Sequence, residues 1–216
     1  MTPQAEAQGL LPRVLPLLSV PGPGRRLLAV AGPPASGKST LAAALAAALT
    51  AAGHKAALVP MDGFHLDNRL LLARGLMARK GAPETFDADG LVALVTRLAA
   101  EPHVVFPLFD RARDLAVAGA GEITADVTIA VVEGNYLMSD AAPWSELAPL
   151  WHASLFLDLP EATLRARLIE RWLDHGLSLP EATARTEEND LPNAMGILAH
   201  RLPASLTLHP ASRAVL

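Results

Sequence analysis

The sequence predicts an α/β fold in which a mostly parallel, doubly wound sheet carries helices on both faces. Short apolar runs recur along the chain, helical patterns separate several of them, and Gly, Asp or Glu follow many of the runs. With 216 residues, of which 51% are apolar, the chain can bury a sizeable core. One domain covering residues 1–216 is therefore the expected organisation.

The expected elements follow in chain order. A helix is predicted at 4–19, ended by the turn-forming PGPG at 21–24, so that 1–24 form an N-terminal helix and linker. Strands are predicted for the apolar runs at 27–32, 55–60, 104–109, 127–132 and 154–159, with a last strand at 205–209. Further helices are predicted for the Ala-rich stretch that Gly53 can cap and for two amphipathic patterns, at 41–53, 89–101 and 161–176.

Composition and charge narrow the classes of partner. The net charge is −4 and no block of like charge occurs, so a nucleic acid is not an expected partner. The absence of Cys excludes disulfides, thiolate metal sites and thiol nucleophiles, and it suits the cytoplasm, which is the predicted location. Pro12, Arg13 and Pro16 interrupt the apolar N-terminal stretch, so neither a signal peptide nor a membrane span is expected. A homodimer is compatible with the sequence.

The stretch GPPASGKST matches the pattern G-x-x-x-x-G-K-S/T. In this pattern backbone N–H groups face the phosphates, Lys38 neutralises β and γ oxygens, and Ser39 offers a hydroxyl to Mg²⁺. An expected strand precedes it and a helix follows, which favours the motif over a chance glycine turn. The sequence thus predicts a P-loop NTPase with three α/β/α layers. The N-K-x-D pattern that reads guanine is absent, which favours ATP over GTP. The predicted nucleotide-binding loop comprises Gly32, Pro33, Pro34, Ala35, Ser36, Gly37, Lys38, Ser39 and Thr40.

A second stretch, MDGFHLDN at 61–68, follows an expected strand at the edge of the sheet where ligands bind. Phosphoryl transfer to an alcohol needs a carboxylate beside the acceptor hydroxyl, and Asp62 fits that position. The alternative is a turn or helix N-cap, since Asp-Gly is a frequent turn pair. His65 is either a hydrogen-bond partner of the acceptor or a structural histidine. Other acidic residues end or follow strands and are expected at the same edge, namely Asp110, Glu133 and Asp158.

In this order, GPPASGKST, VPMDGFHLDN, RKGAPETFD (79–87) and VVEGNYLM (131–138) resemble the P-loop small-molecule kinases that include uridine kinase, bacterial pantothenate kinase and phosphoribulokinase. Within this family the chain is most similar to nucleoside kinase-like members and fructose transport system kinases. The resemblance implies that Asp62 is the general base and that Glu133 joins Ser39 at the Mg²⁺ site. It also implies an Arg-bearing lid helix, with Arg165, Arg167 and Arg171 as nucleotide-binding candidates.

Arg167 is the favoured catalytic arginine beside Lys38 and Asp62, because 167 and 171 share one helix face. A solvated helix face is the alternative for all three lid arginines. The acceptor pocket is expected beside RKGAPETFD. Its candidate residues are Asp62, His65, Lys80, Phe86, Arg111, Glu133 and Tyr136.

Several of these candidates also have a structural interpretation. Arg79 and Lys80 could cap a helix C-terminus, and core packing could explain Phe86 and Tyr136. The stretch at 109–123 departs from the family, because Leu-Ala-Val follows where Asp-Pro is common, so an altered pocket is expected. ENDLPNA at 188–194 resembles the same subgroup, and no role is assigned to it.

These features predict an ATP-dependent, Mg²⁺-requiring kinase that transfers the γ-phosphoryl group to a hydroxyl of a small metabolite. The candidate acceptors are a sugar such as fructose, a nucleoside, or a pantothenate-like acid. The alternative is a nucleotide-operated binding module that has no small-molecule acceptor. Because such a switch needs no base directed at an acceptor, the Asp62 stretch favours the kinase.

Overall fold

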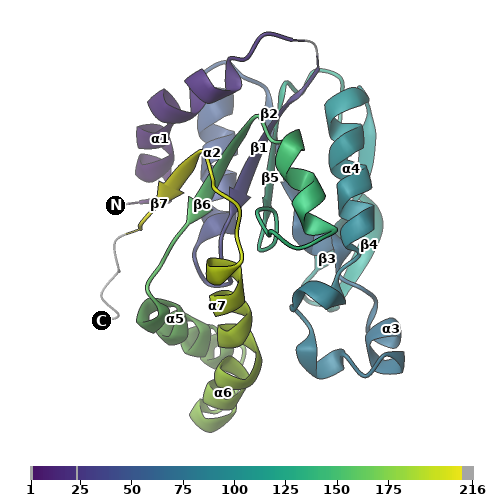
Figure 1. Cartoon of the computed structure of the whole chain (residues 1–216), viewed down its shortest axis with the longest axis vertical. Helices are drawn as coiled ribbons and strands as arrows, with labels where there is room; N and C mark the ends of the chain where they lie inside the picture. Colours follow the sequence, from purple (N-terminus) through teal and green to yellow (C-terminus); the bar gives the residue numbers. More distant parts are fainter. Residues whose placement is uncertain (1, 23, 211–216) are drawn as a thin grey trace.

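A five-stranded parallel sheet forms the centre of the computed structural model, which describes residues 2–22 and 24–210 (Figure 1). The strand order is β2-β5-β1-β6-β7, and every neighbouring pair is parallel. Five expected strands are thereby confirmed with small shifts at their ends. They are β1 (Arg26–Ala31), β2 (Ala56–Pro60), β5 (Ile129–Gly134), β6 (Ala153–Leu157) and β7 (Leu206–Leu208).

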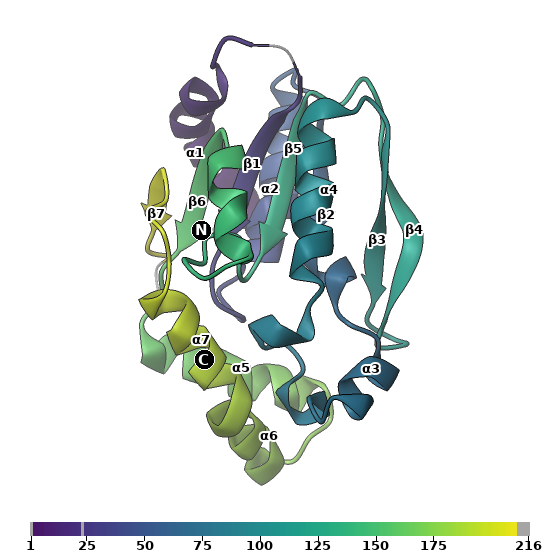
Figure 2. The same ribbon diagram turned by 45° about the vertical axis from the view of Figure 1, so that its right-hand side comes forward.

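Helices cover both faces of this sheet and give the predicted three layers. Along β1, Leu28 and Val30 face a core shared with α1 (Pro3–Leu18) and α2 (Lys38–Ala51). Leu27 and Ala29 face the opposite core, shared with α4 (Ala88–Ala100). This alternation is the period of two that a strand imposes on its side chains. Figure 2 shows α2 behind the sheet and α4 in front of it.

The N-terminal helix is part of the core. Thr2 caps it by accepting a hydrogen bond from the Ala5 N–H at 3.2 Å. Ala7 and Val14 are fully buried in the same cluster as the buried face of α2. The helix predicted at 4–19 is confirmed as α1. Of the stretch PGPG that follows, Pro23 lies outside the described residues.

The strand predicted at 104–109 is present, but its expected place in the parallel sheet is wrong. β3 (Val104–Asp110) instead pairs antiparallel with β4 (Leu115–Ile123) in a separate two-stranded sheet. Its register shifts between Phe106 and Leu108, on either side of Pro107, which has no N–H to donate to a neighbouring strand. Asp110 therefore ends a hairpin strand, where its carboxylate accepts a hydrogen bond from Arg113 at 2.7 Å.

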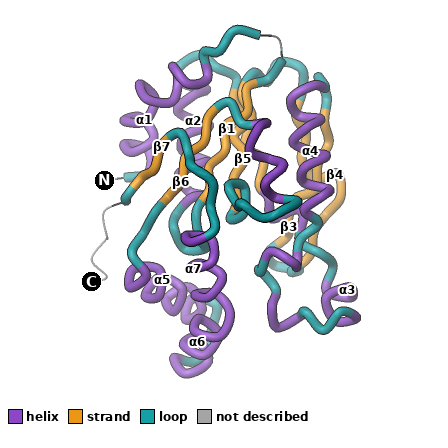
Figure 3. The backbone as a smooth tube through the Cα atoms, viewed as in Figure 1, coloured by secondary structure: helices purple, strands orange, loops and turns teal. Residues whose placement is uncertain are grey.

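The C-terminal part contains more helices than the sequence predicted. α5 (Glu161–Asp174) confirms the pattern at 161–176, and α6 (Leu179–Arg185) follows it. A π-helical turn (Thr186–Asp190) leads into α7 (Leu191–Ala199), which returns the chain to β7. These helices lie near the carboxyl ends of the strands, across from the short α3 (Asn68–Ala73) in Figure 3.

Short 3-10 turns complete the structure at Met61–Phe64, Met77–Arg79, Pro83–Thr85 and Trp144–Leu150. Within the described ranges, no helix is long and apolar enough to cross a membrane.

Candidate active site

The phosphate-binding loop joins β1 to α2 at the carboxyl edge of the sheet. Gly37, directly before α2, has a φ of +92°, a left-handed conformation that glycine adopts without strain. No side chain caps the first turn of α2. The hydroxyl Oγ of Ser36 is buried and has no hydrogen-bond partner among the described residues. An uncapped helix N-terminus and an unpaired hydroxyl are donors that phosphate oxygens accept, so the loop fits a nucleotide.

The other residues of this loop shape it or lie at its rim. The Pro33 carbonyl accepts a hydrogen bond from the Ser36 N–H at 3.2 Å. Ala35 has a φ of +61°, an unusual value for a residue with a Cβ. Thr40 is exposed in the first turn of α2. The compact turn keeps its backbone close to the start of the helix.

Lys38, Ser39 and Glu133 meet beside this loop. Ser39 Oγ donates to Glu133 Oε2 at 3.0 Å, and Glu133 is only 4% exposed. Burial raises the pKa of Glu133, although the charge of Lys38 opposes that rise. Burial also lowers the pKa of Lys38, against the carboxylates of Glu133 and Asp62. One cation and two carboxylates thus interact in a small, partly dry volume.

The predicted metal residues, Ser39 and Glu133, are therefore in contact. A hydroxyl and a carboxylate oxygen are ligands that Mg²⁺ accepts together with water and phosphate. In the part of the chain that the structure describes, no group of three or more His, Cys, Asp or Glu side chains could hold a metal ion alone. This donor set suits an ion that arrives with a nucleotide.

Asp62 lies in the 3-10 turn directly after β2. It does not cap a helix, since that role belongs to Asp67, which accepts from the Arg69 N–H at 2.8 Å to start α3. The Asp62 side chain is 22% exposed, and its Oδ2 accepts a hydrogen bond from Arg111 Nη2 at 2.5 Å. Of the two structural alternatives for Asp62, the helix N-cap is therefore wrong, whereas Asp62 does lie in a turn.

Gly63 explains how Arg111 reaches Asp62. A Cβ at position 63 would lie 2.1 Å from the Pro107 carbonyl oxygen in β3. Only glycine lets the turn pack this closely on the hairpin. Arg111 follows β3 directly, so this close packing brings its guanidinium to the Asp62 carboxylate.

His65 supports the same turn. Its Nδ1 lies 2.8 Å from the Asp62 carbonyl oxygen, which can only accept, so Nδ1 carries the hydrogen. The ring packs between Phe86 and Phe109, at centroid distances of 4.1 and 4.6 Å. Burial lowers the pKa of His65. The neutral ring therefore keeps Nε2 as a hydrogen-bond acceptor.

Phe86 and Tyr136 belong to an aromatic cluster with Trp144. The Tyr136 ring centroid lies 5.6 Å from that of Phe86 and 5.2 Å from that of Trp144. The Tyr136 hydroxyl donates to the Gly81 carbonyl at 2.6 Å, and burial raises its pKa. Tyr136 thus ties the segment after β5 to the RKGAPETFD loop.

The Lys80 side chain forms a hydrogen bond and an ion pair with other side chains of the protein. Its Nζ donates to Asn68 Oδ1 at 2.7 Å and pairs with the Asp114 carboxylate at 2.8 Å. Its side chain is 11% exposed and lies over the Phe109 ring, 5.2 Å from the centroid. These contacts join α3 to the β3–β4 hairpin. Lys80 is also the C-cap residue of the 3-10 turn Met77–Arg79, where its backbone N–H donates to the Met77 carbonyl at 3.2 Å.

The three lid candidates have different surroundings. Arg167 Nη1 donates to the carbonyls of Ala35 and Ser36 at 3.3 and 3.4 Å, so α5 places it on the phosphate loop. Arg171 stacks on Trp172, 5.6 Å from the ring centroid, and its charge helps to lower the pKa of Lys38. Arg165 instead pairs with Glu161 at 2.8 Å and with Glu187. The structure does not bring Arg165 to the loop.

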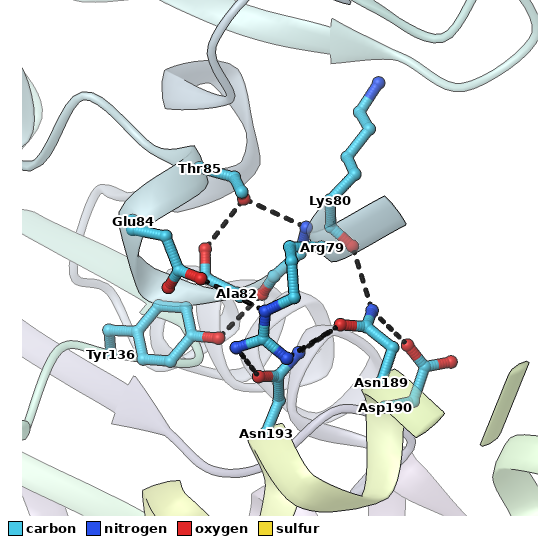
Figure 4. A network of polar contacts seen from close by, with 10 residues as sticks. Arg79, Lys80, Ala82, Glu84, Thr85, Tyr136, Asn189, Asp190 and Asn193 are labelled. Atoms are coloured by element: carbon cyan, nitrogen blue, oxygen red, sulfur yellow. Dashed lines mark hydrogen bonds and ion pairs between the residues drawn. The ribbon is translucent and has the colours of Figure 1, made fainter. Parts of the chain in front are cut away.

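Sequence reasoning missed the contacts of Arg79 (Figure 4). Arg79 donates to Asn189 Oδ1 at 3.3 Å and to Asn193 Oδ1 at 3.5 Å, and it pairs with Glu84 at 3.2 Å. Asn189 also donates to the Lys80 carbonyl at 3.3 Å. The stretch ENDLPNA therefore connects α7 to the RKGAPETFD loop. The asparagines of this stretch were the feature of the sequence that indicated hydrogen bonds of this kind.

A cavity of about 770 Å³ lies beside this network, next to the RKGAPETFD stretch where the acceptor pocket was expected. Its walls come from the loop at 83–89, the segment at 135–144 and helix α7. Both segments were singled out in the sequence, but only folding sets them opposite each other.

Comparison with known proteins shows which family the chain belongs to. No protein-family model matches it. Protein YggC of Escherichia coli, whose activity is uncharacterised, is 36% identical over 89% of this chain and 81% of its own length. A Schizosaccharomyces pombe protein provisionally designated uridine kinase C227.14 is 35% identical over 78% of this chain and 76% of its own length.

The solved structure of a Silicibacter sp. TM1040 protein, provisionally designated a fructose transport system kinase, is 54% identical. It superimposes with a TM-score of 0.89 over 96% of this chain and 99% of its own. The chain belongs to the P-loop small-molecule kinases of the uridine kinase, pantothenate kinase and phosphoribulokinase family. This P-loop kinase is a phosphotransferase that uses an alcohol group as acceptor, and the sequence-based family prediction is confirmed.

Proposed function

We propose that this P-loop kinase transfers the γ-phosphoryl group of ATP to a hydroxyl of a small metabolite, with Asp62 as the general base. The observation that carries the proposal is the place of Asp62 at the carboxyl edge of the sheet. It follows Pro60 by two residues, and Pro60 pairs in register with Glu133, which accepts a hydrogen bond from Ser39 of the phosphate loop. A half-buried carboxylate beside a phosphate loop is what the deprotonation of an acceptor alcohol requires.

In the proposed reaction the acceptor oxygen attacks the γ-phosphorus, and the bond from that phosphorus to the β,γ-bridging oxygen breaks. The hydroxyl proton passes to the Asp62 carboxylate, and ADP leaves. Arg111, paired with Asp62 at 2.5 Å, orients the carboxylate that receives the proton. His65 fixes the backbone of the same turn through the Asp62 carbonyl.

Lys38 and the uncapped N-terminus of α2 would hold the phosphate oxygens, with Arg167 beside the loop. Ser39 and Glu133 would hold Mg²⁺, which supplies positive charge against the phosphates when bound. Because Glu133 is only 4% exposed, few waters screen these interactions, which strengthens them.

The test is ADP formation from ATP and Mg²⁺ with fructose, uridine or pantothenate as the acceptor. Asp62→Asn keeps the shape of the side chain and removes the base, so ATP binding should persist while acceptor-dependent turnover falls roughly 10²- to 10⁴-fold. Wild-type turnover in Asp62→Asn would overturn the role of Asp62. ADP formation of equal size with every acceptor and with none would instead support the nucleotide-operated switch.

A further inference from the structure

The cavity beside the Arg79 network is large enough for a metabolite. Its volume of about 770 Å³ lies within the roughly 300 to 1,000 Å³ that small-molecule sites occupy. Phe86, Tyr136 and Trp144 contribute aromatic surface to its wall. Aromatic surface packs well against sugar or base rings.

Two wall residues of this cavity are neighbours of residues in the proposed phosphoryl-transfer centre. Asn135 lines it two residues after Glu133, and at about 3.3 Å per strand residue their Cα atoms are on the order of 7 Å apart. Phe86 forms another wall and packs on His65, which in turn binds the Asp62 carbonyl. A molecule in the cavity could therefore extend one hydroxyl toward Asp62.

The side-chain oxygen of Asn135 has no partner among the described residues at this position. This Oδ1 atom is buried and accepts no hydrogen bond from any described residue. Buried amide oxygens are normally paired, because losing water without gaining a donor is unfavourable. A ligand hydroxyl or N–H group in the cavity would supply the missing donor.

The charges on the cavity wall disfavour an anionic ligand. Three arginines and four carboxylates line it. Arg79 is paired with Glu84, and Arg201 is paired with Asp158 at 3.2 Å. Arg74, the third arginine, is exposed at the surface. A carboxylate or phosphate ligand would thus meet more negative than positive charge, whereas an uncharged ligand would not be repelled.

We propose that this cavity holds the unreactive part of an uncharged, hydroxyl-bearing acceptor, and that Asn135 selects it by accepting a hydrogen bond from it. This inference rests on the proposed kinase function and adds a substrate class and a specificity-determining residue to it. Fructose and uridine represent the favoured class, and pantothenate represents the disfavoured anionic class.

Gly196 is a position from which a larger side chain would block the cavity. It lines the cavity from α7, and a Cβ added there would meet no atom within 4 Å. Gly196→Phe should therefore fill the cavity. Gly9→Phe is the matched control, since Gly9 is an exposed helical glycine of α1 with equally open space. Asn135→Leu removes the amide at similar volume and serves as a second variant.

Two measurements distinguish ligand binding in the cavity from phosphoryl transfer. Equilibrium binding of radiolabelled fructose and uridine reports on the cavity, and ADP formation reports on the reaction. We expect Gly196→Phe and Asn135→Leu to weaken binding of the better uncharged probe at least tenfold and to raise its KM likewise. A fluorescent ATP analogue should bind both variants within twofold of wild type, and Gly9→Phe should match wild type throughout.

The inference is overturned if neither uncharged probe binds the wild-type protein, if both cavity variants bind them normally, or if pantothenate is the preferred acceptor. The proposed function alone fails if ADP formation is independent of any acceptor although fructose or uridine binds to the wild-type protein and this binding is lost in Gly196→Phe.

Discussion

Replacing Gly63 by Ala should uncouple the Asp62 turn from the β3–β4 hairpin. The new Cβ would lie 2.1 Å from the Pro107 carbonyl oxygen, whereas real Cβ contacts are essentially never shorter than 3.0 Å. Turn and hairpin must therefore separate by about 0.9 Å, the difference between these two distances. A misplacement of about 1 Å in a catalytic group costs roughly 10²-fold in rate, so kcat/KM for the acceptor should fall about 100-fold.

The assay is steady-state ADP formation with the best acceptor, together with chemical denaturation. Overpacking of this kind typically costs about 1 to 3 kcal/mol in the free energy of unfolding. ATP affinity should be unchanged, because the phosphate loop follows a different strand. Gly9→Ala is the control, since its Cβ meets nothing within 4 Å. If Gly63→Ala keeps its kcat/KM within threefold of wild type, the hairpin does not position Asp62.

The remaining predictions concern three charged or titratable groups. Arg167→Ala should weaken ATP binding about tenfold in a fluorescence titration, because Arg167 contacts the phosphate loop. Arg165→Ala should leave ATP binding unchanged, because the Arg165 guanidinium is paired with Glu161. Equal losses of ATP affinity in the two variants would contradict this prediction. Arg111→Ala should lower acceptor turnover roughly tenfold at unchanged ATP affinity, by freeing the Asp62 carboxylate to rotate, and unchanged kinetics would refute that role. Burial lowers the pKa of His65 in the folded state, so the unfolded chain binds a proton more readily. The free energy of unfolding should therefore fall as the pH drops below about 6.5, and less steeply in His65→Asn; parallel pH profiles would argue against a buried neutral ring.

Local patterns were sufficient for much of this architecture. The phosphate loop, α2, α5 and five strands of the parallel sheet follow from glycine spacing and apolar runs that a short window of sequence contains. The run at 104–109 misled the prediction, because its apolar composition equally suits a strand of a buried parallel sheet or of a hairpin. Pro107 has no N–H group to donate to a neighbouring strand, so its presence argued against a place inside the parallel sheet.

Side-chain partners were harder to predict than elements. Lys80 and Arg165 were expected to serve a ligand as free cations, yet each is paired with a carboxylate of the protein. Arg79 was weighed as a helix cap, yet its partner Asn189 is 110 positions away. No periodicity in the sequence encodes a contact at that separation.

The sequence by itself determined the nucleotide loop, the family and the carboxylate candidate Asp62, because each depends on residues that are neighbours in the chain. The tertiary structure alone decided that Gly63 lets the hairpin bring Arg111 to Asp62, and that α7 faces the loop at 83–89 across a cavity. Those features arise from packing between distant segments, and packing depends on the shape and volume of the whole core.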